Sequence, residues 1–169
     1  MVYVVGYERR DLCRTGRKPK VLRLSKRAEY AILTLSHLGG RSLGRPATVS
    51  SMAQRYGLPR PLLAKVCQTL KNGGMVTSVK GSGGGYLLAR PLEEISVADV
   101  LECFDVSVAL VECVESQEGC QTAAHCDIKA PMSALSEAVL GFLQRVSLKS
   151  LVGSPSEFPE NLSIFRLAP

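Results

Sequence analysis

The chain has 169 residues, a length that suits one medium-sized domain or a small domain with an appendage. Apolar residues make up 46% of it and there is no tryptophan, so leucine, valine and alanine must form most of the core. No apolar run approaches the roughly 20 residues that a membrane span needs, and the N-terminus lacks the apolar segment of a signal peptide. These features predict a cytoplasmic protein with no membrane partner.

The net charge of +6 is distributed unevenly along the chain. Residues 1–20 carry a net charge of +4, residues 21–91 carry +10 with a single acid, Glu29, and residues 92–169 carry −8. Such asymmetry indicates a polyanion-binding half joined to a half that avoids the polyanion. An ordinary solvated surface is the plainer alternative.

Residues 1–20 show no periodic pattern and are expected to form a flexible basic N-terminal extension, in which we assign Cys13 no role. From Leu24 to Leu38 the apolar residues recur at helical spacing, which predicts a helix. Ser25 is its expected N-cap, and Glu29 lies in the early turns, where a negative charge suits the helix dipole.

Two short helices joined by a tight turn come next. Thr48 can cap a helix over 49–56, and Gly57 supplies the turn. A second helix is predicted over 60–72, with Pro61 in its first turn and Gly73 at its end. Its expected buried face includes Cys67. This pattern is typical of a helix-turn-helix, in which the second helix enters the major groove of DNA.

A glycine-rich hairpin follows directly. Residues 75–79 and 86–88 predict two strands joined by a turn over 80–85. A hairpin after a recognition helix is the wing of a winged helix, and its glycines allow close approach to a phosphate backbone. A phosphate-binding loop of an enzyme does not fit, because no Lys-Ser/Thr pair opens a helix after the glycines.

Beyond the wing, Ser96 is expected to cap a helix over 97–104 that contains Cys103, a small core residue or a metal ligand. Cys113, Cys120 and Cys126 then fall within a stretch of fourteen residues of acidic character, separated by six and by five residues. These gaps are wider than in structural zinc sites. Three thiolates on one loop can hold an iron–sulfur cluster, while zinc and a metal-free redox switch stay open as alternatives.

Several motifs of this chain resemble the Rrf-two family of bacterial winged-helix regulators, to which the cluster-sensing IscR and NsrR types belong. They are LRLSKRAEYAI, the helix-turn-helix, the glycine-rich wing ending in YLLARP, and EEISVADVLECFD. The resemblance covers roughly residues 22–152. The ending FLQRVSLKSLVG is most similar to the regulators of the SUF iron–sulfur assembly system. The family implies that the three loop cysteines bind a [2Fe–2S] or [4Fe–4S] cluster.

The fourth cluster ligand is an open position. The IscR type supplies a histidine three residues after the third cysteine, where this chain has Lys129, and His125 is not in the matching place. NsrR-like members carry an acid in the first helix that ligates the partner's cluster, at the place of Glu29. We therefore expect Glu29 to be the fourth ligand. The alternatives are a plain first-turn carboxylate, an ion pair with Lys26, and Cys103 as the ligand.

After Pro131 the sequence predicts one long helix with an apolar stripe at spacings of three and four. Such a seam is typical of helix-on-helix packing, and the family implies homodimers. A lone amphipathic core helix is the alternative. The expected dimer seam consists of Met132, Leu135, Val139, Phe142 and Val146.

The resulting prediction is a mainly α protein with a small β-hairpin. It comprises an extension (1–20), a winged helix-turn-helix (21–105), a cysteine-rich loop (106–130), a dimerisation helix (131–152) and a tail (153–169). It is expected to bind double-stranded DNA under the control of its cluster and to regulate iron–sulfur assembly or iron and redox stress genes. The alternative is a cluster-free regulator controlled by thiol oxidation or by a protein partner.

Two groups of side chains are the predicted DNA contacts. Phosphate contacts are expected from Lys26, Arg55, Lys71, Lys80 and Arg90, and contacts to base edges from Arg60, Pro61, Ala64 and Lys65. No catalytic spacing involves either histidine, His37 or His125, so the sequence predicts neither an enzyme nor a small-molecule substrate.

Overall fold

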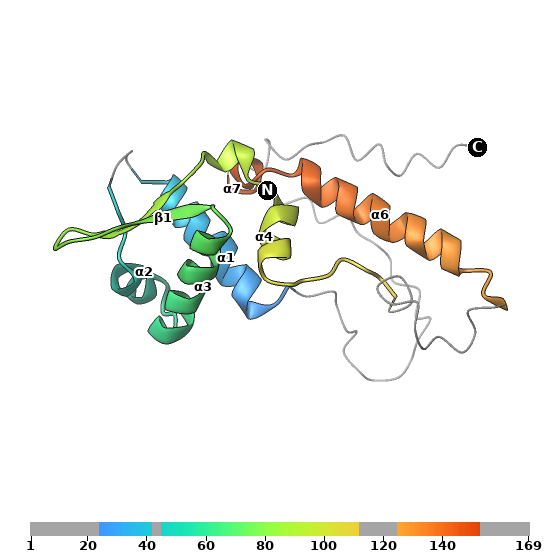
Figure 1. The fold of residues 1–169 in the computed structure, drawn as a ribbon, viewed down its shortest axis with the longest axis horizontal. Helices are drawn as coiled ribbons and strands as arrows, with labels where there is room; N and C mark the ends of the chain where they lie inside the picture. Colours follow the sequence, from blue (N-terminus) through green and yellow to red (C-terminus); the bar gives the residue numbers. More distant parts are fainter. Residues whose placement is uncertain (1–23, 42–44, 112–124, 153–169) are drawn as a thin grey trace, which may run out of the picture.

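The computed structural model describes residues 24–41, 45–111 and 125–152. Within these ranges the chain is mainly helical, with one antiparallel sheet of two strands, and the predicted fold class is confirmed. The hairpin projects at one end of the molecule and the long helix α6 extends toward the other (Figure 1). The extension, most of the cysteine loop and the tail lie outside the described residues.

Helix α1 (Lys26–Gly39) forms the centre of the winged-helix part. Ser25 caps it, since its hydroxyl accepts a hydrogen bond from the backbone N–H of Ala28 at 3.2 Å. Its apolar face is buried as the spacing predicts: Ala28, Ala31, Leu35 and Leu38. α1 is therefore fixed in the core, and its polar flanks are left for contacts on either side.

Helices α2 (Val49–Tyr56) and α3 (Arg60–Asn72) have the predicted bounds. Thr48 accepts from the N–H of Ser51 at 3.0 Å and so caps α2. Gly57 ends α2 with φ 63°, a left-handed conformation that favours glycine. α3 buries Leu63, Val66, Cys67 and Leu70 against the core. The opposite side of α3 is consequently free to face a ligand.

The wing consists of β1 (Val76–Val79) and β2 (Gly85–Leu88), with Val76 opposite Leu88 and Val79 opposite Gly85. A third segment joins it, because Ala47 and Tyr86 exchange backbone hydrogen bonds of 2.9 and 2.8 Å. The segment before α2 therefore fastens the hairpin to the helix-turn-helix.

This junction predicts a large effect for a small substitution. A Cβ on Gly85 would lie 2.5 Å from the carbonyl oxygen of Ala47, whereas a Cβ on Gly83 would meet nothing within 4 Å. We expect Gly85→Ala to lower the free energy of unfolding by about 1–3 kcal/mol, since backbone must move to admit the methyl group. Gly83→Ala is the control and should be nearly neutral in denaturant titrations. Equal stability of the two variants would contradict this account of the wing.

A short 3-10 helix, η1 (Leu92–Glu94), follows the wing and was not predicted from the sequence. Helix α4 (Val97–Cys103) then begins with a reciprocal cap, in which the Ser96 hydroxyl accepts from the N–H of Asp99 and the Asp99 carboxylate accepts from the N–H of Ser96. Asp105, two residues after the end of α4, has φ 52°, a left-handed backbone conformation.

The C-terminal part differs from the prediction in two ways. Helix α6 (Lys129–Arg145) begins two residues before Pro131, which lies within its first turn, where its missing N–H costs nothing. The predicted single helix over 131–152 is also wrong, because it breaks at Val146 and resumes as α7 (Leu148–Val152). The backbone of Val97 donates to Val146, and that of Leu148 to Ile95, at 2.9 and 2.8 Å.

These two hydrogen bonds interrupt the helix between α6 and α7. Both Val146 and Leu148 are buried in the core there. Val146 is 2% exposed, so its assignment to the dimer seam is wrong. Of all the helices in the described parts of the chain, not one combines the length and the hydropathy that crossing a bilayer requires.

Candidate functional site

The outer side of α3 carries a continuous exposed stripe. Pro61, Ala64 and Gln68 follow one another at spacings of three and four, and Lys65 lies beside Ala64. All four are exposed, and so is Arg60 at the first position of the helix. All four predicted base-edge residues therefore lie on the surface of α3, as a recognition helix requires. Gln68, which the sequence reasoning missed, extends the same stripe by one turn.

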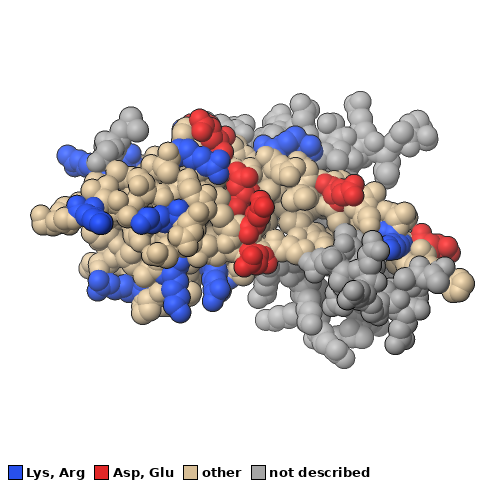
Figure 2. All heavy atoms as spheres, viewed as in Figure 1, with Lys and Arg blue, Asp and Glu red and all other residues tan. Residues whose placement is uncertain are grey.

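The charges are unevenly distributed over the surface of the molecule (Figure 2). On the face shown in Figure 2, lysine and arginine gather over the end that carries α2, α3 and the hairpin, whereas acids form a band over the α4 region. Arg55, Lys71 and Lys80 belong to the basic end and are exposed. An acidic boundary behind a basic surface directs the binding of a polyanion to one end.

Two of the predicted phosphate contacts are engaged within the chain. Lys26 forms an ion pair with Glu29 at 2.5 Å. Arg90 lies 3.7 Å from the Asp99 carboxylate and donates to the carbonyl of Glu94 at 3.3 Å, and its Nε is buried. Arg90 thus connects the end of the wing to α4. The number of basic residues in the sequence could not reveal this structural role.

His37 also has a structural place. Its Nδ1 lies 3.0 Å from the Tyr56 hydroxyl, and the two rings meet edge to face, which links α1 to α2. Burial, followed by the nearby charges of Arg41 and Arg55, lowers the pKa of His37. The ring is therefore neutral near pH 7, and no acid–base partner accompanies it within the described residues.

The cysteine segment starts and ends beside α6. Cys113 and Cys120 lie outside the described residues, while Cys126 is half-buried three residues before α6 and forms no disulfide there. On the other side of the segment, the backbone of Leu110 donates to the Ser136 hydroxyl of α6 at 3.2 Å. The loop is thus closed against one helix at both of its ends.

Of the three loop cysteines, only Cys126 belongs to the described residues. Cysteine thiolates fit a soft metal or an iron–sulfur cluster. Within the described ranges alone, no three potential ligands come together.

Glu29 does not adjoin the stripe on α3. It lines a groove of about 580 Å³ between α1 and α7, together with Leu24, Tyr30, Ile32, Leu33, Ser36, Leu151 and Val152. Leu24, Leu151 and Val152 are each about 40% exposed. A carboxylate at the edge of an exposed apolar groove is accessible to another chain. Among the described residues, Glu29 and Cys126 share no cluster of three potential metal ligands.

Cys67 and Cys103 are poor candidates for ligands or redox groups. Cys67 is fully buried in α3, and this burial raises the pKa of its thiol to about 11. Burial also raises the pKa of Cys103, with further contributions from Glu102 and Asp99. The Cys103 sulfur occupies the space where a Cβ on Gly73 would lie, so it packs against the end of α3. Both thiols are protonated near neutral pH and act as small core residues.

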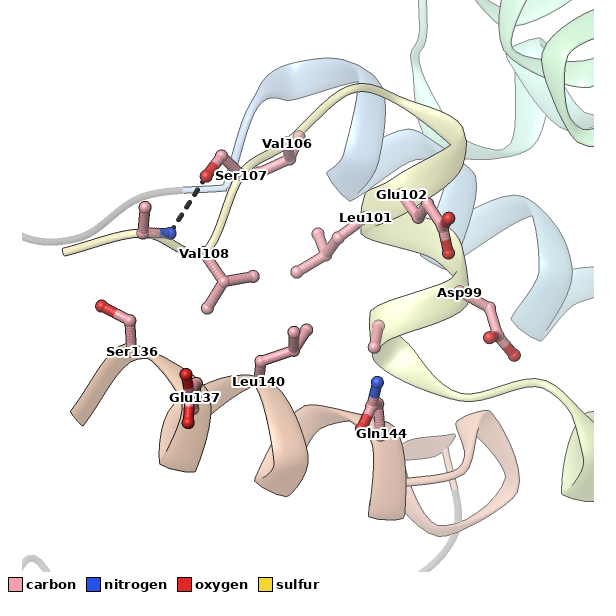
Figure 3. A pocket seen from close by; sticks show the side chains of 12 residues that line it. Asp99, Leu101, Glu102, Val106, Ser107, Val108, Ser136, Glu137, Leu140 and Gln144 are labelled. Atoms are coloured by element: carbon pink, nitrogen blue, oxygen red, sulfur yellow. Dashed lines mark hydrogen bonds between the residues drawn. The ribbon is translucent and has the colours of Figure 1, made fainter. Parts of the chain in front are cut away.

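Helix α6 has one face turned to its own chain and another turned outward. Leu140 points toward Leu101 and Val108 across a hollow of about 510 Å³ between α4, residues 106–109 and α6, with Glu102 and Glu137 at its rim (Figure 3). Of the predicted seam, Leu135 is 45% exposed, Met132 and Val139 are half-buried, and Phe142 packs partly against the core. The apolar surface that α6 turns outward is therefore narrower than the dimer seam predicted from the sequence.

The comparisons with known proteins agree with this architecture. The family model described as Rrf2, iron-dependent transcriptional regulator, matches residues 24–154. The transcriptional regulator IscR of Photorhabdus laumondii is 34% identical over 133 residues, which cover 79% of this chain and 80% of that protein. IscR of Escherichia coli is 31% identical over 79% of this chain and 82% of its own.

Solved structures show the same fold. That of T. potens IscR has a TM-score of 0.56 at 25% identity and covers 78% of this chain and 86% of its own. That of CymR, the global cysteine regulator of B. subtilis, has a TM-score of 0.63 at 23% identity and covers 78% and 97%.

The recognition stripe, the wing and the charge division together define a winged helix-turn-helix transcriptional regulator, a DNA-binding protein and not an enzyme. The extent of the family match places it further: the chain belongs to the Rrf2 family of transcriptional regulators. The resemblance expected from the sequence motifs is thereby confirmed.

Proposed function

We propose that this protein is a cytoplasmic homodimer that binds double-stranded DNA with an affinity set by an iron–sulfur cluster, either [2Fe–2S] or [4Fe–4S]. Cys113, Cys120 and Cys126 provide three ligands, and Glu29 of the partner subunit provides the fourth. The regulated genes are those of iron–sulfur assembly or of iron and redox stress. The observation that carries the proposal is the closure of the three-cysteine loop against α6 at both ends.

Several features support a cluster over a thiol switch. Three thiols belong to one segment of the sequence, and both described ends of this segment lie beside α6. Cys67 and Cys103 have raised pKa values, and they are buried in the core and partly buried against it, respectively. IscR relatives at 31–34% identity belong to a family described as iron-dependent. A bound cluster supplies a centre that reacts with small oxidants and exchanges its weakest ligand first.

The chain's own residues would transmit that event. Residues 105–111 connect the loop directly to α4, and Arg90 joins α4 to the end of the wing through Asp99. Glu29 lies on α1, the helix against which α3 packs. A cluster held by both subunits would therefore fix the spacing of two recognition helices, and its loss would change their DNA affinity by favouring another arrangement.

Glu29 is proposed as the fourth ligand because of its position. It is the only acid among residues 21–91, and it faces the apolar groove at α7 and not the stripe on α3. Its observed ion pair with Lys26 is an exposed contact within one turn of helix. Such pairs contribute little to stability, so ligation by Glu29 would displace it at small cost.

Glu29→Ala should shorten the lifetime of the cluster in air and reduce the difference in DNA affinity between the loaded and the empty protein. The reason is that a carboxylate, a weak ligand beside thiolates, would be replaced by solvent. Cys103→Ala is the matched comparison and should leave both properties unchanged. Anaerobic reconstitution followed by visible spectroscopy measures the first property, and gel shifts measure the second. A native spectrum and lifetime in Glu29→Ala would transfer the role to Cys103, His125 or solvent.

The proposed function as a whole is tested by anaerobic purification. We expect visible absorption from the cluster, together with iron and sulfide, and specific binding to duplexes selected from a random pool. Binding should differ between the loaded protein and the protein stripped by a chelator. DNA binding without any cluster would instead support the second candidate, a regulator controlled by oxidation of the loop thiols or by a protein partner.

A further inference from the structure

A hollow of about 280 Å³ lies between α1 and α3, beside the recognition stripe. It is lined by Arg27, Lys65, Val66, Gln68, Thr69 and Phe104. Two of these side chains are cations, and they come from different helices. No acid lines the hollow. Arg27 belongs to neither group of DNA contacts that the sequence predicts.

Arg27 and its neighbours on α1 face different surroundings. Arg27 lines the hollow at α3, whereas Glu29, two residues later, lines the groove at α7. In the part of the chain that the structure describes, Arg27 and Lys65 form no ion pair, while Lys26 is paired with Glu29. Arg27 and Lys65 are both exposed. Two unpaired cations at one concave place repel each other unless an anion joins them.

The position of the hollow indicates which anion fits. A helix with its side chains is roughly 10–12 Å across, and the major groove is about 12 Å wide. A helix inserted there has phosphates along both of its sides, so the element beside it meets the backbone. α1 is packed beside α3, and Arg27 and Lys65 line the gap between the two helices.

We propose that Arg27 and Lys65 together hold one phosphate of the DNA backbone in this hollow. The Thr69 hydroxyl and the Gln68 amide supply further hydrogen-bond donors, and Val66 and Phe104 form an apolar wall. Lys65 is thereby a phosphate contact and not a reader of base edges, which reassigns one of the sequence predictions. The proposal rests on DNA binding by the proposed regulator, and it does not depend on the cluster.

Phosphate binding by this pair predicts a specific change in salt dependence. The affinity for a labelled random-sequence duplex, measured by fluorescence anisotropy from roughly 50 to 200 mM salt, gives a slope that reports the number of phosphate contacts. Arg27→Ala and Lys65→Ala should each reduce the magnitude of that slope by about 0.9. Arg27→Lys should retain most of it. Lys149→Ala, which removes a cation paired with Glu93 at α7, is the control and should not change it.

Sharing of one phosphate adds two further expectations. The double variant should lose less affinity than the two single losses predict together, since the second cation acts on a contact already broken. Selection from a random pool should return the same preferred sequences for Lys65→Ala as for the unaltered protein, whereas Arg60→Ala should return different ones. A changed sequence preference with Lys65→Ala would overturn the proposed phosphate contact. Unchanged salt slopes for both single variants would overturn it as well.

Inorganic phosphate distinguishes a DNA contact from a site for a free anion. If phosphate saturates amide shifts of α1 and α3 in NMR spectra while Arg27→Ala leaves DNA affinity unchanged, the hollow binds a free anion only and the proposal is wrong. If the unaltered protein binds no duplex at all, the proposed function fails together with the proposed phosphate contact. Circular dichroism verifies that each variant is folded.

Discussion

We expect replacement of Cys113, Cys120 and Cys126 by serine to abolish the proposed cluster binding and, with it, the proposed control of DNA affinity. This is the largest functional effect that we expect from any substitution, because serine cannot replace thiolate as a ligand for iron–sulfur centres. The triple variant, purified without oxygen, should show no visible absorption and no bound sulfide. Its DNA affinity should equal that of the unaltered protein after chelation, a change of about 5- to 150-fold if the coupling is typical of allosteric systems.

The controls for this experiment come from the other cysteines of the chain. Cys13→Ser removes a thiol to which we assign no role, and Cys103→Ala removes one that packs against the end of α3. Both variants should keep the spectrum. Because Cys67 is fully buried, it is a less suitable control, since its replacement would disturb the core. A full spectrum in the triple variant would refute the assignment of the loop as the cluster site.

We expect Val139→Asp to convert the proposed dimer into a monomer. Val139 is half-buried one turn after Leu135, which is 45% exposed on the same side of α6. An uncompensated carboxylate at an apolar contact costs several kcal/mol, about enough to separate a dimer at micromolar concentration. Size-exclusion chromatography with light scattering measures the mass. DNA affinity should fall as well, because two linked recognition helices bind better than one.

Ala134→Asp introduces the same charge on the same helix at an exposed position and should leave the mass unchanged. Helix content by circular dichroism shows whether either variant unfolds. If Val139→Asp keeps the dimer mass and its native helix content, α6 does not form the interface. The apolar groove between α1 and α7 would then be the next surface to test.

Local chemistry determined most of the winged-helix part. The bounds of α2 and α3 follow from residues within a few positions of each end: the Thr48 cap, the left-handed Gly57, Pro61 in the first turn and Gly73 after the last. The wing follows from its glycines. The family and the DNA-binding class were equally accessible, since the motifs and the charge division are properties of the sequence alone.

Long-range contacts decided the rest. The apolar spacing continues through Val146, yet backbone hydrogen bonds to the start of α4, some fifty residues earlier in the chain, end α6 and bury that side chain. Arg90 has the charge of a phosphate contact, but the fold places Asp99 beside it. Arg27 and Glu29 belong to one helix, and only the packing of α3 and α7 around α1 assigns them to different surfaces. Spacing along a chain specifies which residues share a face, whereas the tertiary structure specifies what that face meets.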